Sequence, residues 1–299
     1  MSVQVSAGKP EAEVAIDLNL VRALIEDQAP RFADLPITPL TEGWDNLIYR
    51  LGTELSIRLP RRRLGAEFIR HEQRWLPHLA AQLPIPVSAP VHIGVPGRGY
   101  PWHWSILPWF DGVCADEQPP AATEAPAFAR FLKALHQPAP PDAPVNVYRG
   151  VPISDRYEST VERLERLGTD PAATSRPLLR CWEAALAAEP GRESRWLHGD
   201  LHAQNVLIRD GRISAVIDWG DITGGDVATD LAGIWSLFPE REARRQVLEL
   251  YAPDPATLAR AQGWAFVFGV VLVDSGLINS PRHANQGRQL LKRLAEDVK

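Results

Sequence analysis

The chain has 299 residues, of which 45% are hydrophobic and 23% are charged, so it can bury an ordinary globular core and is neither disordered nor fibrous. Its net charge of −5 argues against a nucleic-acid partner, because binding a polyanion requires a clustered basic face, whereas an acidic surface tolerates a cationic substrate better. The two cysteines have neither metal-ligand nor CxxC spacing, so the sequence predicts no disulfide framework or zinc site and favours a reducing cytoplasm.

The amino-terminal third is predicted to combine helices with an antiparallel sheet. A polar tail over residues 1–13 is expected to fray, and apolar spacing of three and four predicts helices over 17–32 and 65–83. Short apolar runs separated by tight turns predict strands within 36–60. Two further strand-like runs, around residue 91 and over 103–107, pair most simply with that sheet.

After a proline-rich loop the chain becomes mainly helical, and the lobe boundary is predicted there. The apolar run over 264–273 is roughly half of the ~20 residues that cross a bilayer, and the first residues lack the features of a signal peptide. We therefore predict a buried helix there and no membrane partner. The helices predicted after the loop span 122–136, 154–167, 175–188, 226–237, 240–250, 255–278 and 281–298.

The string HGDLHAQN at 198–205 has a spacing suited to phosphoryl transfer. Asp200 could orient an accepting hydroxyl and take up its proton, while Asn205, five residues on, could reach the same metal–phosphate cluster. His198 would brace the loop through hydrogen bonds. The alternative is that Asp200 and Asn205 only cap turns, as these residue types often do.

Three later aspartates of the same stretch, Asp218, Asp226 and Asp230, also have predicted roles. Asp218 comes after the strand-like run ISAVI and before Trp-Gly, where a strand end would hold a carboxylate at the mouth of a cleft. Alone, this pattern is commonly just a turn, but together with Asp200 it indicates a second magnesium ligand. Asp226 is interpreted as the N-cap of the next helix, and Asp230 as a buried acceptor that ties this helix to the loop.

The strings HGDLHAQNVLI, VIDWGD and GDVATDLA resemble the aminoglycoside phosphotransferase family, which includes macrolide, hygromycin, choline and homoserine kinase relatives. The resemblance spans roughly residues 41–237. It implies an α+β, bilobal protein-kinase-like fold, with a small antiparallel-sheet nucleotide-binding lobe over 1–107, a hinge over 108–113 and a mainly helical lobe over 114–299 that holds the catalytic loop and substrate site. It also implies magnesium-dependent transfer from ATP or GTP to a small-molecule hydroxyl, with Asp200 as the catalytic Asp, and Asn205 and Asp218 as metal ligands.

The resemblance also implies a nucleotide grip in the first lobe, where the family has a lysine paired with a glutamate. Here Arg58 stands in the strand and Glu72 in the following helix, so arginine replaces lysine. They could form an ion pair or an inconsequential surface pair, and one of the arginines at 61–63 could supply the phosphate contact instead. Gly43, in the turn 41–46, would let the backbone approach the phosphates, although an ordinary hairpin turn has the same pattern.

The predicted hinge would bind the adenine edge through the carbonyl of Pro108 and the N–H of Phe110. Trp109 and Phe110 could equally be core aromatics. Acidic side chains after the catalytic loop, Asp221 and Asp274, could pair with ammonium groups of an acceptor. Asp274 ends an apolar run and needs a partner or water, and the simpler interpretation is a solvated acid at a helix end.

The acceptor itself is not specified by the sequence. An aminoglycoside or macrolide antibiotic, an amino alcohol or a sugar each remains open. An alternative from another class is a degenerate kinase that binds nucleotide for regulation, for which the Arg58 substitution is the only support. A protein kinase proper is disfavoured because no Ala-Pro-Glu segment follows Asp218. The oligomeric state is not predicted.

Overall fold

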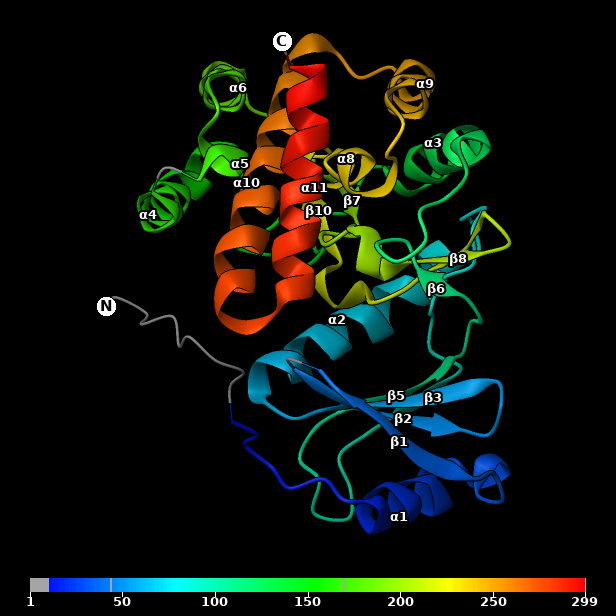
Figure 1. Cartoon of the computed structure of the whole chain (residues 1–299). Coiled ribbons are helices and arrows are strands. Elements are labelled where there is room, and N and C mark those ends of the chain that lie inside the picture. The colour runs from blue at the N-terminus through cyan, green and yellow to red at the C-terminus, as the bar shows by residue number, and fades with distance from the viewer. Residues whose placement is uncertain (1–10, 44, 169, 299) are drawn as a thin grey trace.

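A five-stranded antiparallel sheet forms the centre of the amino-terminal lobe in the computed structural model, which describes residues 11–43, 45–168 and 170–298 (Figure 1). Its strand order is β1-β2-β3-β5-β4. Neighbours in sequence therefore pair through short turns, except that β5 lies between β3 and β4. The strands are β1 (Ile37–Glu42), β2 (Asn46–Leu51), β3 (Leu55–Pro60), β4 (His92–Gly94) and β5 (Trp104–Pro108).

Helix α1 (Leu18–Gln28) covers the outer face of this sheet. Its Leu24 and Ile25 lie in one apolar cluster with Ile57 and Ile106 of the central strands, and full burial of such side chains contributes about 1.5–3 kcal/mol each. The helix was predicted to continue to residue 32 but ends at Gln28. Pro30 is the physical reason, because proline disfavours helical backbone in the residue before it, and a separate 3₁₀ turn follows.

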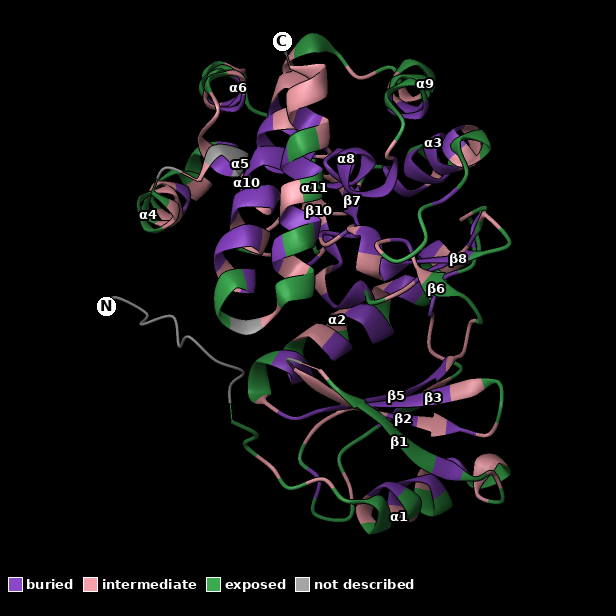
Figure 2. Cartoon of the chain, in the orientation of Figure 1, coloured by how far each residue is buried: buried purple, intermediate pink, exposed green. Residues whose placement is uncertain are grey.

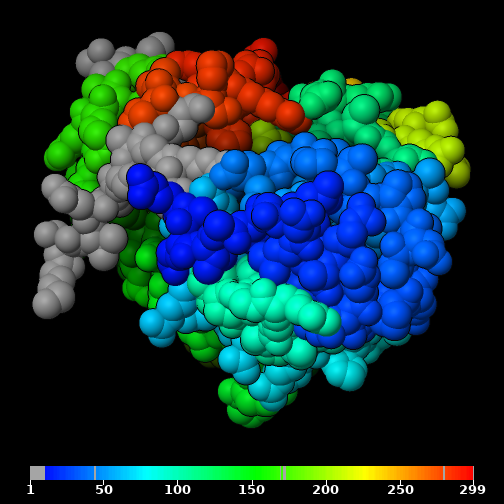
Figure 3. All heavy atoms as spheres, turned by 90° about the horizontal axis from the view of Figure 1, so that it is seen from below, coloured from blue at the N-terminus to red at the C-terminus, as the bar shows by residue number. Residues whose placement is uncertain are grey.

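Helix α2 (Arg63–Ala80) crosses from the sheet toward the second lobe and lies between the two lobes in Figure 1. Figure 3 views the molecule from the amino-terminal side, where α1 and strands β1–β3, in blue, cover most of the face. Of the tail predicted to fray, residues 1–10 lie outside the described part of the chain. Glu13 is held, because its backbone N–H donates to the carbonyl of Arg61 at 2.9 Å.

In the second lobe, helices surround two small sheets. β6 (Val113–Cys114), β8 (Val206–Arg209) and β9 (Arg212–Val216) form one sheet, and β7 (Arg195–Leu197) pairs with β10 (Thr223–Gly225) in the other. Because β5 ends at Pro108 and β6 begins at Val113, the segment between them joins the large sheet to the second lobe. The helices are α3 (Ala125–Leu135), α4 (Tyr157–Leu167), α5 (Pro171–Thr174), α6 (Arg176–Ala187), α7 (Ala228–Leu231), α8 (Gly233–Leu237), α9 (Arg241–Tyr251), α10 (Pro255–Asn279) and α11 (Pro281–Asp297).

Helix α10 is the core helix of this lobe. By length and composition alone it could cross a membrane, but 61% of its apolar stretch is buried inside the protein. It packs against α11, α6, α7 and α4, and much of its ribbon has the colour of buried residues in Figure 2. Trp264 and Phe266 are fully buried there. The predicted buried helix is therefore confirmed, although it is longer than the apolar run that indicated it.

The predicted α+β fold, with a small antiparallel sheet followed by helices, is confirmed. The helix predicted over 226–237 is instead two short helices, α7 and α8, which meet at Ala232. The helices predicted over 122–136 and 154–167 each begin with a 3₁₀ turn, after which regular α-helix starts at Ala125 and Tyr157.

Candidate active site

The loop that carries Asp200 is fixed by a buried carboxylate. Asp230, in α7, is fully buried and accepts the backbone N–H groups of His198 at 2.7 Å and of Gly199 at 2.9 Å. Gly199 has φ +86°, and a Cβ there would lie 2.4 Å from the carbonyl oxygen of Asp221, so only glycine fits. Asp230 thus makes the helix-to-loop connection that its position in the sequence predicted.

His198 links Asp200 to the strand end that carries Asp218. Its Nδ1 accepts the N–H of Asp200 at 3.2 Å, so the ring proton is on Nε2, which donates to the carbonyl oxygen of Ile217 at 3.0 Å. The ring also packs on Trp219, with centroids 4.6 Å apart. His198 is fully buried and braces the loop, as predicted.

Asn205 joins the same backbone segment. Its carbonyl oxygen accepts the N–H of Ile217 at 2.9 Å, and its side-chain Nδ2 donates to the carbonyl oxygen of Asp200 at 2.9 Å. Asp218 follows Ile217 directly, in a left-handed conformation with φ 60° and ψ 67°. The structure therefore brings Asp200, Asn205 and Asp218 together, and the side chain of Asp218 is 56% exposed.

Both carboxylate oxygens of Asp200 have basic partners. Oδ1 accepts from Nη2 of Arg149 at 2.9 Å, and Oδ2 lies 3.2 Å from Nε2 of His202. Burial opposes ionisation of Asp200, but His202 and Arg149 outweigh it and hold the pKa of this carboxyl well below its usual range. Conversely, burial disfavours the His202 cation, but Asp200 outweighs it and raises the pKa of His202 above its ordinary value.

Arg58 connects the amino-terminal lobe to this cluster. Its Nη1 lies 2.7 Å from Oε2 of Glu72, and its Nη2 lies 2.7 Å from Oδ1 of Asp218. Arg58 and Glu72 are 6% and 0% exposed, so they form a buried ion pair and not a surface pair. Arg61 and Arg62 are paired with Glu42 and Asp45 instead. Arg58 is therefore the arginine of this strand that reaches the cluster.

The predicted phosphate turn and hinge have the following geometry. The N–H of Gly43 donates to the carbonyl oxygen of Asn46 at 2.8 Å, while Trp44, in the same predicted turn, lies outside the described residues. Pro108 and Phe110 are both partly exposed, at the end of β5 and just beyond it. Trp109 is not a core aromatic, because it is partly exposed and stacks on the guanidinium of Arg50, 3.9 Å from its ring centroid.

Two acidic residues differ from their predicted environments. Asp274 was expected to be solvated or to face an acceptor, but it lies inside α10 with both oxygens bonded to Arg163 and Arg166 at 2.5–3.1 Å. The sequence around Asp274 did not indicate these ion pairs, because both arginines come from α4, which is far away in sequence. Asp226 was predicted to be an N-cap. The cap position of α7 is Val227, although a carboxylate oxygen of Asp226 accepts the N–H of Ala228 at 3.1 Å.

Asp226 has a second role that the sequence did not indicate, because it forms a buried ion pair with Arg260 at 2.6 Å. Asp221 lies beside the cluster, where Nδ2 of Asn146 donates to its Oδ1 at 2.6 Å. Burial and the neighbouring Asp200 raise the pKa of Asp221. No sequence signal indicated Arg149, because it lies 51 residues before Asp200 in a segment without regular structure.

The donor set fits a magnesium ion. The Asp218 carboxylate and the Asn205 amide supply hard oxygen ligands, which Mg²⁺ prefers together with water and phosphate oxygens. Among the described residues no group of three or more His, Cys, Asp or Glu side chains could hold a metal by itself. A metal here would therefore take most of its ligands from a bound nucleotide and water.

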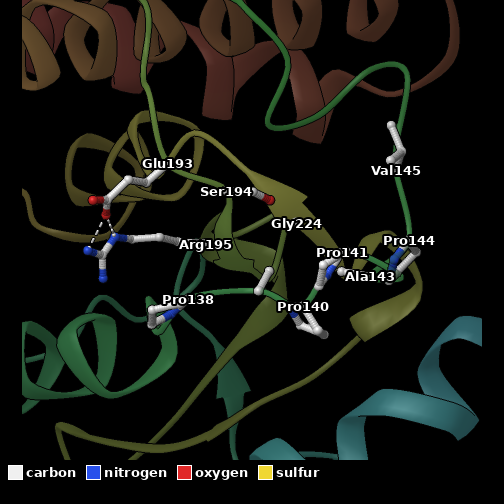
Figure 4. A pocket seen from close by; sticks show the side chains of 11 residues that line it. Pro138, Pro140, Pro141, Ala143, Pro144, Val145, Glu193, Ser194, Arg195 and Gly224 are labelled. Atoms are coloured by element: carbon white, nitrogen blue, oxygen red, sulfur yellow. Dashed lines mark hydrogen bonds and ion pairs between the residues drawn. The ribbon is translucent and has the colours of Figure 1, made fainter.

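The cavity in Figure 4 lies away from this cluster. It has a volume of about 590 Å³ and lies between the proline-rich segment 138–145 and residues 193–195, with Gly224 at its edge. None of Asp200, Asn205 and Asp218 lines it. The chemistry is therefore assigned from the convergence of side chains and not from the size of a cavity.

Comparisons with known proteins found a matching family model and related proteins. A family model described as the phosphotransferase enzyme family matches residues 36–264. The uncharacterized protein YcbJ of Bacillus subtilis (strain 168) is 27% identical over 181 residues, which are 59% of this chain and 56% of that protein. Viomycin phosphotransferase of Streptomyces vinaceus is 46% identical over 61 residues, 19% of this chain and 21% of that protein. The matched region thus spans 56% of the length of the first relative and 21% of the length of the second.

Solved structures share the architecture over nearly the whole chain. An APH(2″) enzyme in complex with GDP and kanamycin has a TM-score of 0.68 at 18% identity, with 94% of this chain and 99% of that chain covered. Macrolide 2′-phosphotransferase MphH from Brachybacterium faecium has a TM-score of 0.56 at 22% identity, with 92% and 98% covered. At these identities the likeness shows the fold alone.

Proposed function

This chain belongs to the phosphotransferase enzyme family, and we propose that it transfers the γ-phosphoryl group of ATP or GTP to a hydroxyl of a small molecule. The observation that carries the proposal is the convergence of Asp200, Asn205 and Asp218, which is held by two hydrogen bonds of the Ile217 backbone, one from the His198 side chain and one to the backbone carbonyl of Asn205. The sequence predicted Asp200 as the base and Asn205 and Asp218 as metal ligands.

Asp200 performs the proton step. As a carboxylate with a lowered pKa it stays ionised and accepts a hydrogen bond from the acceptor hydroxyl, which fixes the direction of attack. The hydroxyl oxygen forms the new bond to the γ-phosphorus, the bond from that phosphorus to the bridging oxygen breaks, and the proton passes to Asp200. The nucleoside diphosphate leaves with the bridging-oxygen electron pair.

Asn205 and Asp218 would hold a magnesium ion, which neutralises charge on the transferred phosphoryl group when it is bound. Arg58 adds a fixed positive charge where the phosphates would lie, and Glu72 keeps it in position. Gly43 and the hinge residues Pro108 and Phe110 would contact the rest of the nucleotide. Solved neighbours hold GDP or ADP, which supports a nucleotide donor without choosing its base.

One observation favours a second function, a regulatory nucleotide-binding protein. In this structure Nη2 of Arg58 lies 2.7 Å from Oδ1 of Asp218, so it contacts an oxygen of a proposed metal ligand. A guanidinium that stayed there would compete with the metal. The catalytic proposal accounts for the contact more simply, since triphosphate oxygens offer Arg58 a replacement partner.

The acceptor is the least specified part of the proposal. The solved neighbours include complexes with kanamycin, gentamicin and streptomycin, and a macrolide enzyme. An aminoglycoside or a macrolide is therefore a candidate, as are the amino alcohols and sugars that the sequence left open. A cationic acceptor would need a carboxylate close to Asp200. Asp221 and Asp274 were the two carboxylates predicted for this role. Asp274 is paired with two arginines, so it is not available to a cationic acceptor.

The test replaces Asp200 by Asn and measures phosphorylated product by mass spectrometry with Mg²⁺-ATP or Mg²⁺-GTP and a panel of these acceptors. We expect turnover to fall by at least about 10³-fold, while nucleotide affinity changes little. Asp210→Asn is the matched control, because Asp210 is 91% exposed in a turn with positive φ that Asn also adopts. Unchanged turnover in Asp200→Asn would refute the assignment.

A further inference from the structure

We propose that the acceptor carries an oxyanion, a carboxylate or a phosphate, and that Arg149 and Arg156 bind this group beside Asp200. The inference rests on the proposed function and names the chemical class of its acceptor. It differs from the cationic substrate that the acidic net charge favoured, because a guanidinium lies in contact with Asp200.

Arg149 stands directly at the catalytic carboxylate. Its Nη2 contacts Asp200 at 2.9 Å, and its guanidinium lies over the ring of Phe268 in α10, 5.0 Å from the centroid. The side chain is 22% exposed, so a bound molecule can reach it. An acceptor hydroxyl that approaches Asp200 must therefore pass a guanidinium.

Arg156 adds a second cation, for which the described part of the chain shows no salt bridge. It ends the 3₁₀ turn Ile153–Arg156, and its guanidinium lies over the ring of Tyr148, 5.6 Å from the centroid. Within residues 11–43, 45–168 and 170–298, no carboxylate pairs with it and its Nε has no hydrogen-bond partner. Burial, together with the nearby positive charges of Arg149 and Arg163, lowers the pKa of Arg156.

The other arginines of this region have partners, which makes Arg156 distinctive. Arg163 and Arg166, on the next turns of α4, both bind Asp274. Asp155 is beside Arg156 in sequence but is exposed and bonded to Ser154. The positive charges of Arg149 and Arg156 repel each other, and an anion bound to both would relieve this repulsion. A bidentate arginine contact suits carboxylate and phosphate oxygens.

The carboxylates near Asp200 do not provide a comparable site for an ammonium group. Asp221 accepts a hydrogen bond from Asn146, and its raised pKa reflects burial and repulsion from Asp200. Arg149 interacts electrostatically with both Asp200 and Asp221. An ammonium group placed there would meet the positive charge of Arg149 first.

The experiment compares three acceptors of equal length that differ in one end group: 4-hydroxybutanoate, butane-1,4-diol and 4-aminobutan-1-ol. With Mg²⁺-ATP or Mg²⁺-GTP, we expect kcat/KM for the hydroxy acid to exceed that for the diol by about tenfold, the effect of one charge-assisted contact, and the amine to be the poorest. Arg156→Gln should reduce the acid-to-diol ratio to about one without raising the KM for nucleotide. The hydroxy acid should also raise the thermal unfolding midpoint of the wild type more than the diol does.

Arg166→Gln is the matched control, because it removes the same charge from α4 at an exposed residue already bound to Asp274. It should keep the preference for the hydroxy acid. Nucleotide hydrolysis is also measured without any acceptor, and we expect it to be slow and to be lost in Asp200→Asn. This measurement distinguishes a failure of the proposed function from a failure of the oxyanion site. Without this hydrolysis or any product, the proposed function fails. If hydrolysis is present but the amine is preferred, the three probes behave alike, or Arg156→Gln leaves the ratio unchanged, the oxyanion site is wrong.

Discussion

Replacing Arg58 by Met should lower the free energy of unfolding by about 3–5 kcal/mol, because it leaves the charge of Glu72 buried without its partner. Glu72 is fully buried and its Oε2 lies 2.7 Å from Nη1 of Arg58. Burial raises the pKa of Glu72 and Arg58 counteracts this rise, so loss of the guanidinium drives the carboxyl toward protonation. The contact of Arg58 with Asp218 adds little, about 0.5 kcal/mol, because the Asp218 side chain is 56% exposed and screened.

The double variant Arg58→Met/Glu72→Leu separates the pair from the packing around it. When both charges are removed, the unpaired carboxylate is gone, and the loss should shrink to about 1 kcal/mol or reverse sign. The difference from the sum of the two single variants measures the coupling between Arg58 and Glu72. Arg58→Lys should be intermediate, since one ammonium can reach Glu72 or Asp218 but does not span both as a planar fork does.

Urea-induced unfolding followed by tryptophan fluorescence gives these values, and an unchanged denaturant slope indicates that the compared states remain the same. The nucleotide KM of each variant gives the functional part, which should rise most in Arg58→Met. A loss below about 1 kcal/mol in Arg58→Met, or strict additivity in the double variant, would refute the reasoning that Arg58 compensates a buried charge.

Three further substitutions test the loop itself. Gly199→Ala should abolish turnover and lower the thermal unfolding midpoint, because its Cβ would meet the carbonyl of Asp221 at 2.4 Å with φ +86°; wild-type behaviour would contradict the loop geometry. Asp230→Asn should cost about 2 kcal/mol in urea unfolding, since its amide leaves a buried N–H unpaired; a loss near zero would show that water replaces the bond. Burial opposes the His202 cation but Asp200 raises the pKa of His202 above its ordinary value, so turnover should rise with pH above the range in which an ordinary histidine titrates, as His202 loses its proton and releases Asp200; a His202→Asn variant that kept this rise would contradict the assignment.

The fold was largely predictable because its elements have strong local signals. The 3.6-residue spacing of α2 and the short apolar runs of β2 and β3 between tight turns depend on residues that are neighbours in sequence. Errors occurred where a local rule acted against the periodic pattern, as at Pro30, which ends α1 early. The short strands β6, β7 and β10 were missed, since strands of two or three residues have no detectable period.

The catalytic cluster was predictable for a different reason. Asp200, Asn205 and Asp218 lie within 19 residues of one another, so a single loop and one strand end place them together and their spacing is visible in the sequence. Their environment was not predictable. Arg149 and His202 set the charge state of Asp200, and nothing in the spacing of Arg149 relates it to a loop 51 residues away.

The acceptor side depends entirely on such distant contacts, and this explains why the sequence indicates the phosphotransferase family but not the substrate. Arg149 comes from an irregular segment, Arg156 from a 3₁₀ turn, and Phe268 and Asp274 from the core helix α10. Asp274 looked available to a cationic acceptor because α4 contributes its two partner arginines from more than 100 residues away. Net charge has the same limit: the value of −5 is a sum over the surface, whereas an acceptor at Asp200 would depend on local charges such as the guanidinium of Arg149.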